Sequence, residues 1–152
     1  MAITLSKEQL IHEIAGIERR QKGSVFSPEV IGKILGHSQP WRSLKKDELI
    51  HVLEAWNHLL ESCPKTANWK TIERGDRRVS LLADGHPWVD YFGFPSLKSA
   101  ELFLEQVLPH CDWAIVRKSG KRVNASFECK VWGLTQESFE AIAPQRLEVC
   151  IR

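Results

Sequence analysis

The sequence predicts an α+β protein in which an N-terminal three-helix region precedes a mainly antiparallel sheet with one or two packed helices. Apolar residues recur at helical spacing as far as Ser62, whereas alternating runs and tight turns follow Pro64. Two stretches, 69–80 and 113–124, share one pattern: a tryptophan, a hydrophobic run, a basic residue, a turn containing glycine, and two basic residues before valine. The chain has 152 residues and is 43% hydrophobic, which is ordinary for a globular protein.

The first three elements are helices with recognisable start and stop signals. Ser6 to Gln9 fits a capping box, and the helix that it opens should end near Gly23. Ser27-Pro28-Glu29 places proline at the first position of a second, shorter helix, which stops at Gly36. A third helix is expected from about Asp47 to Ser62, where leucine, isoleucine and tryptophan form one apolar face.

After the third helix, the pattern predicts the order βββαββαβ. Gly75-Asp76 and Ser119-Gly120 are turn signals of the kind that connects two strands of a hairpin. The expected elements are strands at 69–74, 77–82 and 88–92, a helix from Pro95 to Val107, strands at 113–117 and 122–132, a short helix from Thr135 to Ala143, and a closing strand at 147–151.

One soft boundary divides the chain into a helical region, 1–63, and an α+β region, 64–152, although both can pack as one compact domain. A proline lies a few residues before each tryptophan of the two similar stretches, and a helical pattern precedes each proline. We interpret this as an internal duplication of a helix–hairpin unit. The alternative is two unrelated hairpins that happen to share turn chemistry.

Composition excludes several classes of protein. Four cysteines without CxxC or CxH spacing argue against a zinc site and a disulfide framework. No apolar run reaches the roughly 18 residues of a transmembrane helix, and no signal peptide is recognisable, so we expect a cytoplasmic protein without a membrane partner. The P-loop, the dinucleotide-binding glycine motif and the nucleophile elbow of hydrolases are absent, so no cofactor is expected.

The positive charge of the chain is concentrated at the two predicted hairpins. The first hairpin tip carries Arg74, Arg77 and Arg78, and the second carries Arg117, Lys118, Lys121 and Arg122. Arginine and lysine bind phosphate oxygens, and a two-stranded ribbon fits a major groove. The tips therefore indicate binding to DNA or RNA, with Trp69 and Trp113 available to stack on bases. The alternative is solvated turns with both tryptophans in the core.

The segment from Pro28 to Lys46 resembles a helix-turn-helix. Gly32 fits the point where two helices cross, and Gly36 fits the turn. The resemblance implies a second helix, beginning near Gln39-Pro40, that presents these residues to DNA: Gln39, Arg42, Lys45 and Lys46. Arg42 departs from the motif, which usually buries an aliphatic residue there. The alternative is a plain helical hairpin with a glycine C-cap.

The run from Asp112 to Val116, a turn, and the run from Ser126 to Lys130 resemble the PD-(D/E)xK nuclease family. The resemblance implies that Asp112 and Glu128 hold Mg²⁺ while Lys130 activates water or stabilises the transition state. The chain departs from the family in having Cys111 where proline is usual. It also leaves no room for the family's strand before Asp112.

We therefore expect a non-enzymatic nucleic-acid-binding or regulatory protein that uses the basic hairpin tips and the helix-turn-helix segment. The alternative is a protein-interaction or adaptor module whose anchors would be exposed tryptophans, namely Trp41, Trp88 and Trp132. A metal-dependent nuclease is the third hypothesis. The oligomeric state is left open by the sequence.

Overall fold

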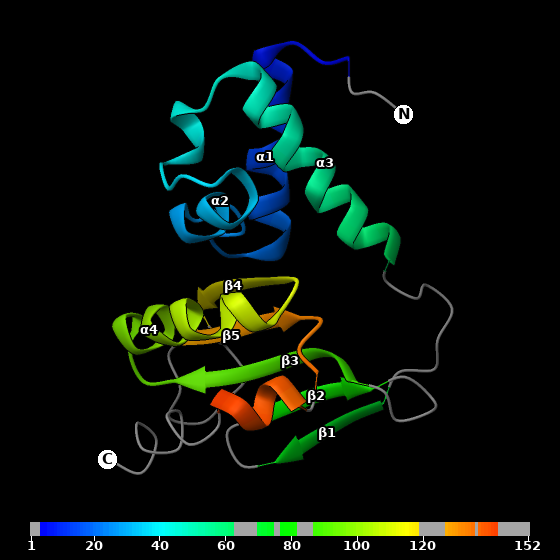
Figure 1. Ribbon diagram of the computed structural model, residues 1–152, viewed down its shortest axis with the longest axis vertical. Helices are drawn as coiled ribbons and strands as arrows, with labels where there is room; N and C mark the ends of the chain where they lie inside the picture. Colours follow the sequence, from blue (N-terminus) through cyan, green and yellow to red (C-terminus); the bar gives the residue numbers. More distant parts are fainter. Residues whose placement is uncertain are drawn as a thin grey trace. The chain divides into compact units, whose positions relative to one another are not determined.

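The computed structural model describes residues 4–62, 70–74, 77–81, 87–118, 127–135 and 137–142. For 70–74, 77–81, 87 and 88 it describes the backbone alone. The chain forms two compact units, Met1–Pro64 and Lys65–Arg152 (Figure 1). The first unit is helical and the second combines helices with an antiparallel sheet, so the predicted α+β class is confirmed. Within the described residues, no helix is both long and apolar enough to cross a bilayer.

The helical unit begins as its capping signals predict. Its elements are α1 (Lys7–Gln21), α2 (Pro28–Leu35), the 3₁₀ helix η1 (Trp41–Ser43) and α3 (Lys46–Ser62). The capping box of α1 is complete, because the Gln9 amide donates to Ser6 Oγ (3.2 Å) and the Ser6 amide donates to Gln9 Oε1 (2.8 Å). Gly36 ends α2 with a φ of 86°, a left-handed conformation that glycine adopts without strain.

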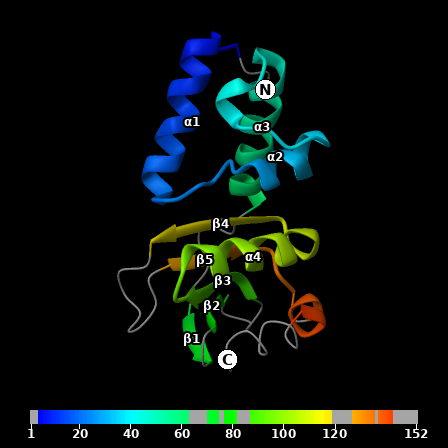
Figure 2. The same cartoon turned by 90° about the vertical axis from the view of Figure 1, so that its left-hand side faces the viewer.

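Helices α1, α2 and α3 form the helical unit (Figure 2), and each contributes buried apolar side chains to its core. Its largest fully buried side chains are Trp56 and Phe26, whose rings meet edge to face with centroids 6.0 Å apart. Each buried side chain of this size contributes about 1.5–3 kcal/mol through its removal from water. The core is therefore built by the helical periodicity that the sequence shows.

Glu18 on α1 accepts hydrogen bonds from two later segments of the helical unit, the loop before α2 and the turn η1. Its Oε2 accepts a hydrogen bond from the Phe26 amide (3.3 Å), and its Oε1 accepts one from Trp41 Nε1 (3.1 Å). The same carboxylate thus holds both the loop before α2 and the 3₁₀ turn before α3. The sequence pattern did not single out this residue.

The α+β unit contains a five-stranded sheet in the order β1-β2-β3-β5-β4, in which every neighbouring pair is antiparallel. Its elements are β1 (Lys70–Arg74), β2 (Arg77–Leu81), β3 (Pro87–Phe94), α4 (Leu97–Val107), the 3₁₀ helix η2 (Leu108–His110), β4 (Trp113–Lys118), β5 (Phe127–Trp132) and a short helix over 137–142. The two hairpins flank the central strand β3, each with its first strand at an edge of the sheet. The closing strand expected at 147–151 lies outside the described residues, and the duplication remains a prediction.

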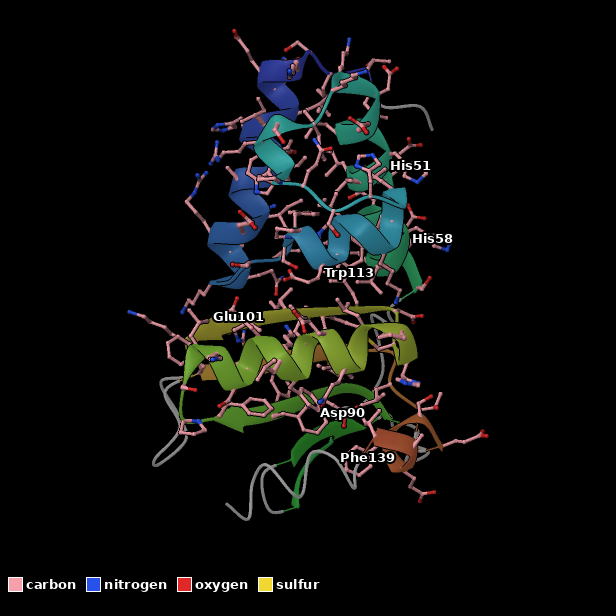
Figure 3. The ribbon with its side chains drawn as sticks, turned by 60° about the vertical axis from the view of Figure 1, so that its left-hand side comes forward. His51, His58, Asp90, Glu101, Trp113 and Phe139 are labelled. Atoms are coloured by element: carbon pink, nitrogen blue, oxygen red, sulfur yellow. The ribbon has the colours of Figure 1, made fainter. Side chains whose placement is uncertain are left out.

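One face of the sheet packs against α4 and the short helix (Figure 1). Phe92 on β3 contacts Phe103 of α4, with ring centroids 4.7 Å apart. It also stacks on Phe139 of the short helix, with centroids 6.0 Å apart (Figure 3 labels Phe139). Cys129 pairs across from Phe92 and is fully buried. Burial, with smaller effects from Cys111 and Glu128, raises the pKa of the Cys129 thiol well above its usual range. This face is therefore an apolar core.

Candidate nucleic-acid interface

The strand register brings the two basic hairpin tips to the same end of the sheet. β3 runs toward this end, where its last residue, Phe94, pairs with Phe127 at the start of β5. Phe127 also pairs with Lys118 at the end of β4. On the other side of β3, Arg77 at the start of β2 pairs with Phe92. We call this the tip end of the sheet; the arrowheads of β1, β3 and β4 all point to it in Figure 1.

Positive charge gathers at the tip end from three elements. Arg74 and Arg77 come from the first hairpin, and exposed Lys118 comes from the second. Between them β3 ends and α4 begins, with exposed Lys98 in its first turn and Ser96 as its cap. A helix N-terminus carries partial positive charge of its own. Asp112, in contrast, lies at the opposite end, where its amide donates to the Trp132 carbonyl (2.9 Å).

Arg74 and Arg77 pair directly across the first hairpin. Like charges at directly opposed positions of an antiparallel pair destabilise the pair. Arg78, the third residue of this tip, pairs in register with Glu73 on β1 and with Tyr91 on β3.

The two described residues of the second tip differ in their surroundings. Arg117 donates from Nε (3.1 Å) and Nη2 (2.9 Å) to Oε1 of Glu128, which is only 3% exposed. Its guanidinium also lies 5.7 Å from the centre of the Tyr91 ring. Arg117 is therefore engaged in the sheet, while Lys118 is exposed. Lys121 and Arg122 lie outside the described residues.

The predicted second helix of the helix-turn-helix is wrong. Where it was expected, the chain forms only the three-residue turn η1, flanked by extended Pro40 and Leu44. Burial of Trp41 and Leu44 against the core fixes this irregular path. Gly32 does mark a close approach, since a Cβ there would lie 2.5 Å from Ser38 Oγ, but the approaching segment is a loop and not a helix.

The four residues assigned to that helix do not lie on one helix that could present them together to DNA. Arg42 lies over the ring of buried Trp41, 4.4 Å from its centre, and Gln39 Nε2 donates to Ser43 Oγ (3.0 Å). Lys45 and Lys46 are exposed at the start of α3. Both lysines are free to meet solvent ions, but no helix aligns them with Gln39 or Arg42.

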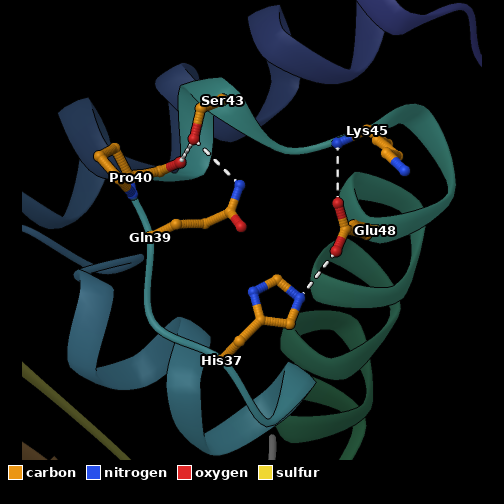
Figure 4. A network of polar contacts seen from close by, with 6 residues as sticks. All are labelled: His37, Gln39, Pro40, Ser43, Lys45 and Glu48. Carbon is orange, nitrogen blue, oxygen red and sulfur yellow. Dashed lines mark hydrogen bonds and ion pairs between the residues drawn. The ribbon is translucent and has the colours of Figure 1, made fainter.

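The loop that replaces the helix is held by a polar network (Figure 4). Glu48 Oε1 accepts from the Lys45 amide (3.0 Å), and Glu48 Oε2 contacts His37 Nε2 (2.9 Å). The hydrogen bond from Lys45, together with the smaller effect of His37, lowers the pKa of the Glu48 carboxyl below its usual value. The network therefore secures the connection from α2 to α3 and is a structural feature.

The residues predicted for a nuclease site do not converge. Asp112 precedes Trp113, which pairs with Trp132, whereas Glu128 lies four positions away along β5, a separation of about 13 Å. Lys130 shares the side of Glu128, as predicted, but its Nζ lies 4.6 Å from the centre of the Trp132 ring. In the part of the chain that the structure describes, no three His, Cys, Asp or Glu side chains are grouped to hold a metal. The antiparallel register is the reason, because it places the start of β4 beside the end of β5.

The described tryptophans are buried. Their burial affects two expected roles of tryptophan, namely stacking on bases and anchoring a protein partner. Trp41 is 7% exposed, and Trp113 and Trp132 are each 4% exposed (Figure 3 labels Trp113). Trp113 thus offers no free ring for stacking on bases, and Trp41 and Trp132 offer none for a protein partner. Trp69 and the side chain of Trp88 lie outside the described part of the structure. The large exposed apolar side chains that are described are all leucines: Leu60, Leu97 and Leu102.

Sequence reasoning missed Lys98 as a member of the basic group. The signal was present, since Pro95-Ser96 marks a helix start directly after a strand, and Lys98 follows two residues later. What the sequence did not reveal was that this helix start lies at the same end of the sheet as both hairpin tips. The chain matches no family model, and no curated protein or solved structure was found to be similar to it.

Proposed function

We propose that this chain is a non-enzymatic nucleic-acid-binding protein whose interface is the tip end of the sheet. The observation that carries the proposal is the register, which places Arg74 and Arg77 at the same end as Lys118. Lys98 adds a further cation between them. Arginine and lysine are the side chains that most often bind phosphate oxygens, and several in one place favour a polyanion over a single small anion.

The charge balance supports the same interface. The net charge of the chain is +2, and acidic and basic residues balance in the helical unit, so the excess lies in the α+β unit. The buried carboxylate of Glu128 is neutralised by Arg117 and does not oppose an incoming phosphate. Where the recognition helix was expected, the described chain forms the short turn η1, so we place the binding surface on the sheet.

The proposal is tested by fluorescence anisotropy with labelled DNA and RNA, both single-stranded and duplex, over a range of salt concentrations. Phosphate contacts release counterions, so affinity should fall steeply as salt rises. Mg²⁺ is included and the products are run on a gel, and we expect no cleavage. If none of the nucleic acids binds at low salt, or if the affinity is independent of salt, the proposal is wrong.

A pair of charge-matched variants locates the surface. Arg77→Gln combined with Lys118→Gln removes one cation from each tip, whereas Lys7→Gln combined with Lys33→Gln removes two exposed cations from the helical unit. Both variants lower the net charge by the same amount. A nonspecific effect of net charge would therefore weaken nucleic-acid binding equally in both. We expect the first variant to bind about 60-fold more weakly near 0.1 M salt and the second to bind as the parent does.

A further inference from the structure

We infer that Arg19 and Arg20, whose side chains lie together over Gly16 of α1, form a binding site for a phosphate group. The site belongs to the helical unit, and it does not rest on the proposed function, which concerns the sheet. The inference starts from the position of the two guanidinium groups. A Cβ at Gly16 would lie 3.3 Å from Nη1 of Arg20 and 3.6 Å from Nη2 of Arg19.

Gly16 lies on the outward side of α1, away from the core of the helical unit. The core residues of this helix are Leu10, Ile14 and Ile17, and a residue two positions after Ile14 points to the opposite side of a helix. Gly16 is nevertheless buried. Apart from the backbone of α1 and the two chain neighbours, the only described atoms within 4 Å of its Cβ position are the two guanidinium nitrogens. The arginine side chains therefore cover the glycine.

The glycine gives the two arginine side chains room to lie on the helix backbone. Glycine in the middle of a helix is less favourable than alanine, because its backbone loses more freedom on folding. A closely crossing helix would explain a glycine at this point, but no described atom of another helix approaches Gly16 within 4 Å. Arg19 and Arg20 occupy the positions three and four residues later, whose side chains reach back over the same face.

Both guanidinium groups are available to an anion. Arg19 and Arg20 are exposed, and neither side chain forms an ion pair or a hydrogen bond with any described residue. The adjacent acid, Glu18, does not neutralise them, because its two oxygens accept hydrogen bonds from the Phe26 amide and from Trp41 Nε1. Two positive charges thus lie side by side at the surface without a described carboxylate between them.

The two guanidinium groups are close enough to share one phosphate. Nη1 of Arg20 and Nη2 of Arg19 lie near the same point, so their separation cannot exceed the sum of 3.3 and 3.6 Å. Two charge-assisted hydrogen bonds of about 2.8 Å each, together with the width of one phosphate group, span such a separation. Arginine presents its donors in a planar fork that matches phosphate oxygens. Two guanidinium charges also match the charge of about −1.5 to −2 that a phosphomonoester carries at pH 7.

The two arginines also stabilise the end of α1. They lie in its last turn, where positive side chains interact favourably with the partial negative charge of the helix C-terminus. That effect requires the two charges but not the glycine. A substitution of Gly16 that keeps both arginines therefore separates a phosphate site from an effect on the helix end.

The experiment titrates the full chain with inorganic phosphate at constant ionic strength, with chloride as the balancing anion, and follows the backbone amides of α1 by NMR. Arg19→Gln and Arg20→Gln should each weaken binding about tenfold, since each removes charge-assisted hydrogen bonds. Gly16→Leu should weaken it about threefold, because leucine, a good helix former, fills the space that the guanidinium groups cover. The matched control, Arg42→Gln, removes another exposed arginine of the same unit and should bind phosphate as the parent does.

A parallel titration with a nucleoside 5′-monophosphate distinguishes the sources of the phosphate group. Equal affinity assigns the site to the phosphate group alone, and tighter binding that Arg19→Gln abolishes assigns it to a phosphate ester. The inference is overturned if neither ligand gives a saturable shift, or if the parent and both arginine variants bind alike. Undiminished binding by Gly16→Leu also overturns it, because the pair would then not depend on its position over the glycine.

The outcomes are independent of those for the proposed function. Arg77→Gln combined with Lys118→Gln should leave the affinity for inorganic phosphate unchanged, because neither residue belongs to the helical unit. A phosphate affinity that falls in this variant as much as in Arg19→Gln overturns the inference. A failure of the chain to bind nucleic acid leaves it intact. Circular dichroism of each variant shows whether it has folded.

Discussion

Arg117 donates two hydrogen bonds to a single oxygen of Glu128, directly across the β4–β5 hairpin. The carboxylate is 4% exposed and the guanidinium 22% exposed, so the pair is mostly removed from water. Removing either partner of such a pair leaves the other charge buried and unpaired, which strongly destabilises the folded state. The pair links β4 to β5 near the end of β4.

Arg117→Met should lower the free energy of unfolding by about 3 kcal/mol, because it leaves the Glu128 charge buried and unpaired. Arg117→Met combined with Glu128→Leu should recover most of that loss, since both charged groups are then replaced by apolar ones. Urea denaturation of the parent and of both variants measures these differences. A double variant as unstable as the single one would show that the pair is not the cause.

Gly133→Ala should destabilise the α+β unit by about 2 kcal/mol. Gly133 has a φ of 74°, and a Cβ at this position would collide with the Asp112 carboxylate. Asp112→Ala added to Gly133→Ala removes the collision with the carboxylate but keeps the strained backbone and the 3.1 Å approach of the Asp112 Cβ, so about 1 kcal/mol of the loss should persist. Thermal unfolding of the single and double variants separates the two effects. Equal stability of Gly133→Ala and the parent would contradict the described turn.

Glu18→Ala should lower the free energy of unfolding by about 2 kcal/mol, because two donors, the Phe26 amide and Trp41 Nε1, lose their acceptor. Glu18→Gln retains one acceptor oxygen, so its loss should be smaller. The matched control is Glu13→Ala, an exposed residue of the same helix. The account of this contact is wrong if both alanine variants unfold at the same urea concentration.

The Glu48 network should make the helical unit less stable in acid. The folded chain lowers the pKa of Glu48, so the stabilisation is present at neutral pH and is lost as the pH falls through that lowered pKa. Glu48→Gln can still accept from the Lys45 amide but cannot form the ion pair with His37, whereas Glu48→Ala loses both contacts. We expect the difference in melting temperature between parent and Glu48→Gln to shrink as the pH falls from about 5 to about 3, through and below the ordinary glutamate pKa of about 4.3. A difference that stays constant over this range would contradict the ion pair.

The helices and hairpins were predictable because their signals are local. Ser6 with Gln9, and Gly36 after α2, encode helix ends within a few residues, and the alternating runs encode the strands. The helix expected at 39–46 failed because burial of Trp41 and Leu44, together with the distant acceptor Glu18, outweighs the local pattern. Such long-range contacts leave no periodic trace in a sequence.

The candidate site was predictable in its residues but not in its arrangement. Clustered arginine and lysine identified the tips, yet the sheet order that brings both to one end depends on how β3 pairs with β2 and β5. The same register separates Asp112 from Glu128. Knowing only that β4 and β5 are neighbouring strands would have left a close approach of the two carboxylates possible. Pairing register therefore determines which of the predicted residues lie near one another and which do not.

The most direct test of the central claim is the slope of log affinity for duplex DNA against log salt concentration. If the tips act as one phosphate-binding surface, Arg74→Gln, Arg77→Gln and Lys118→Gln together should reduce the slope by about 2.7, because about 0.9 is lost for each phosphate contact. The control with Lys7→Gln, Lys33→Gln and Lys46→Gln should keep the slope of the parent. An unchanged slope in the tip variant, or an equal reduction in both, would contradict the claim.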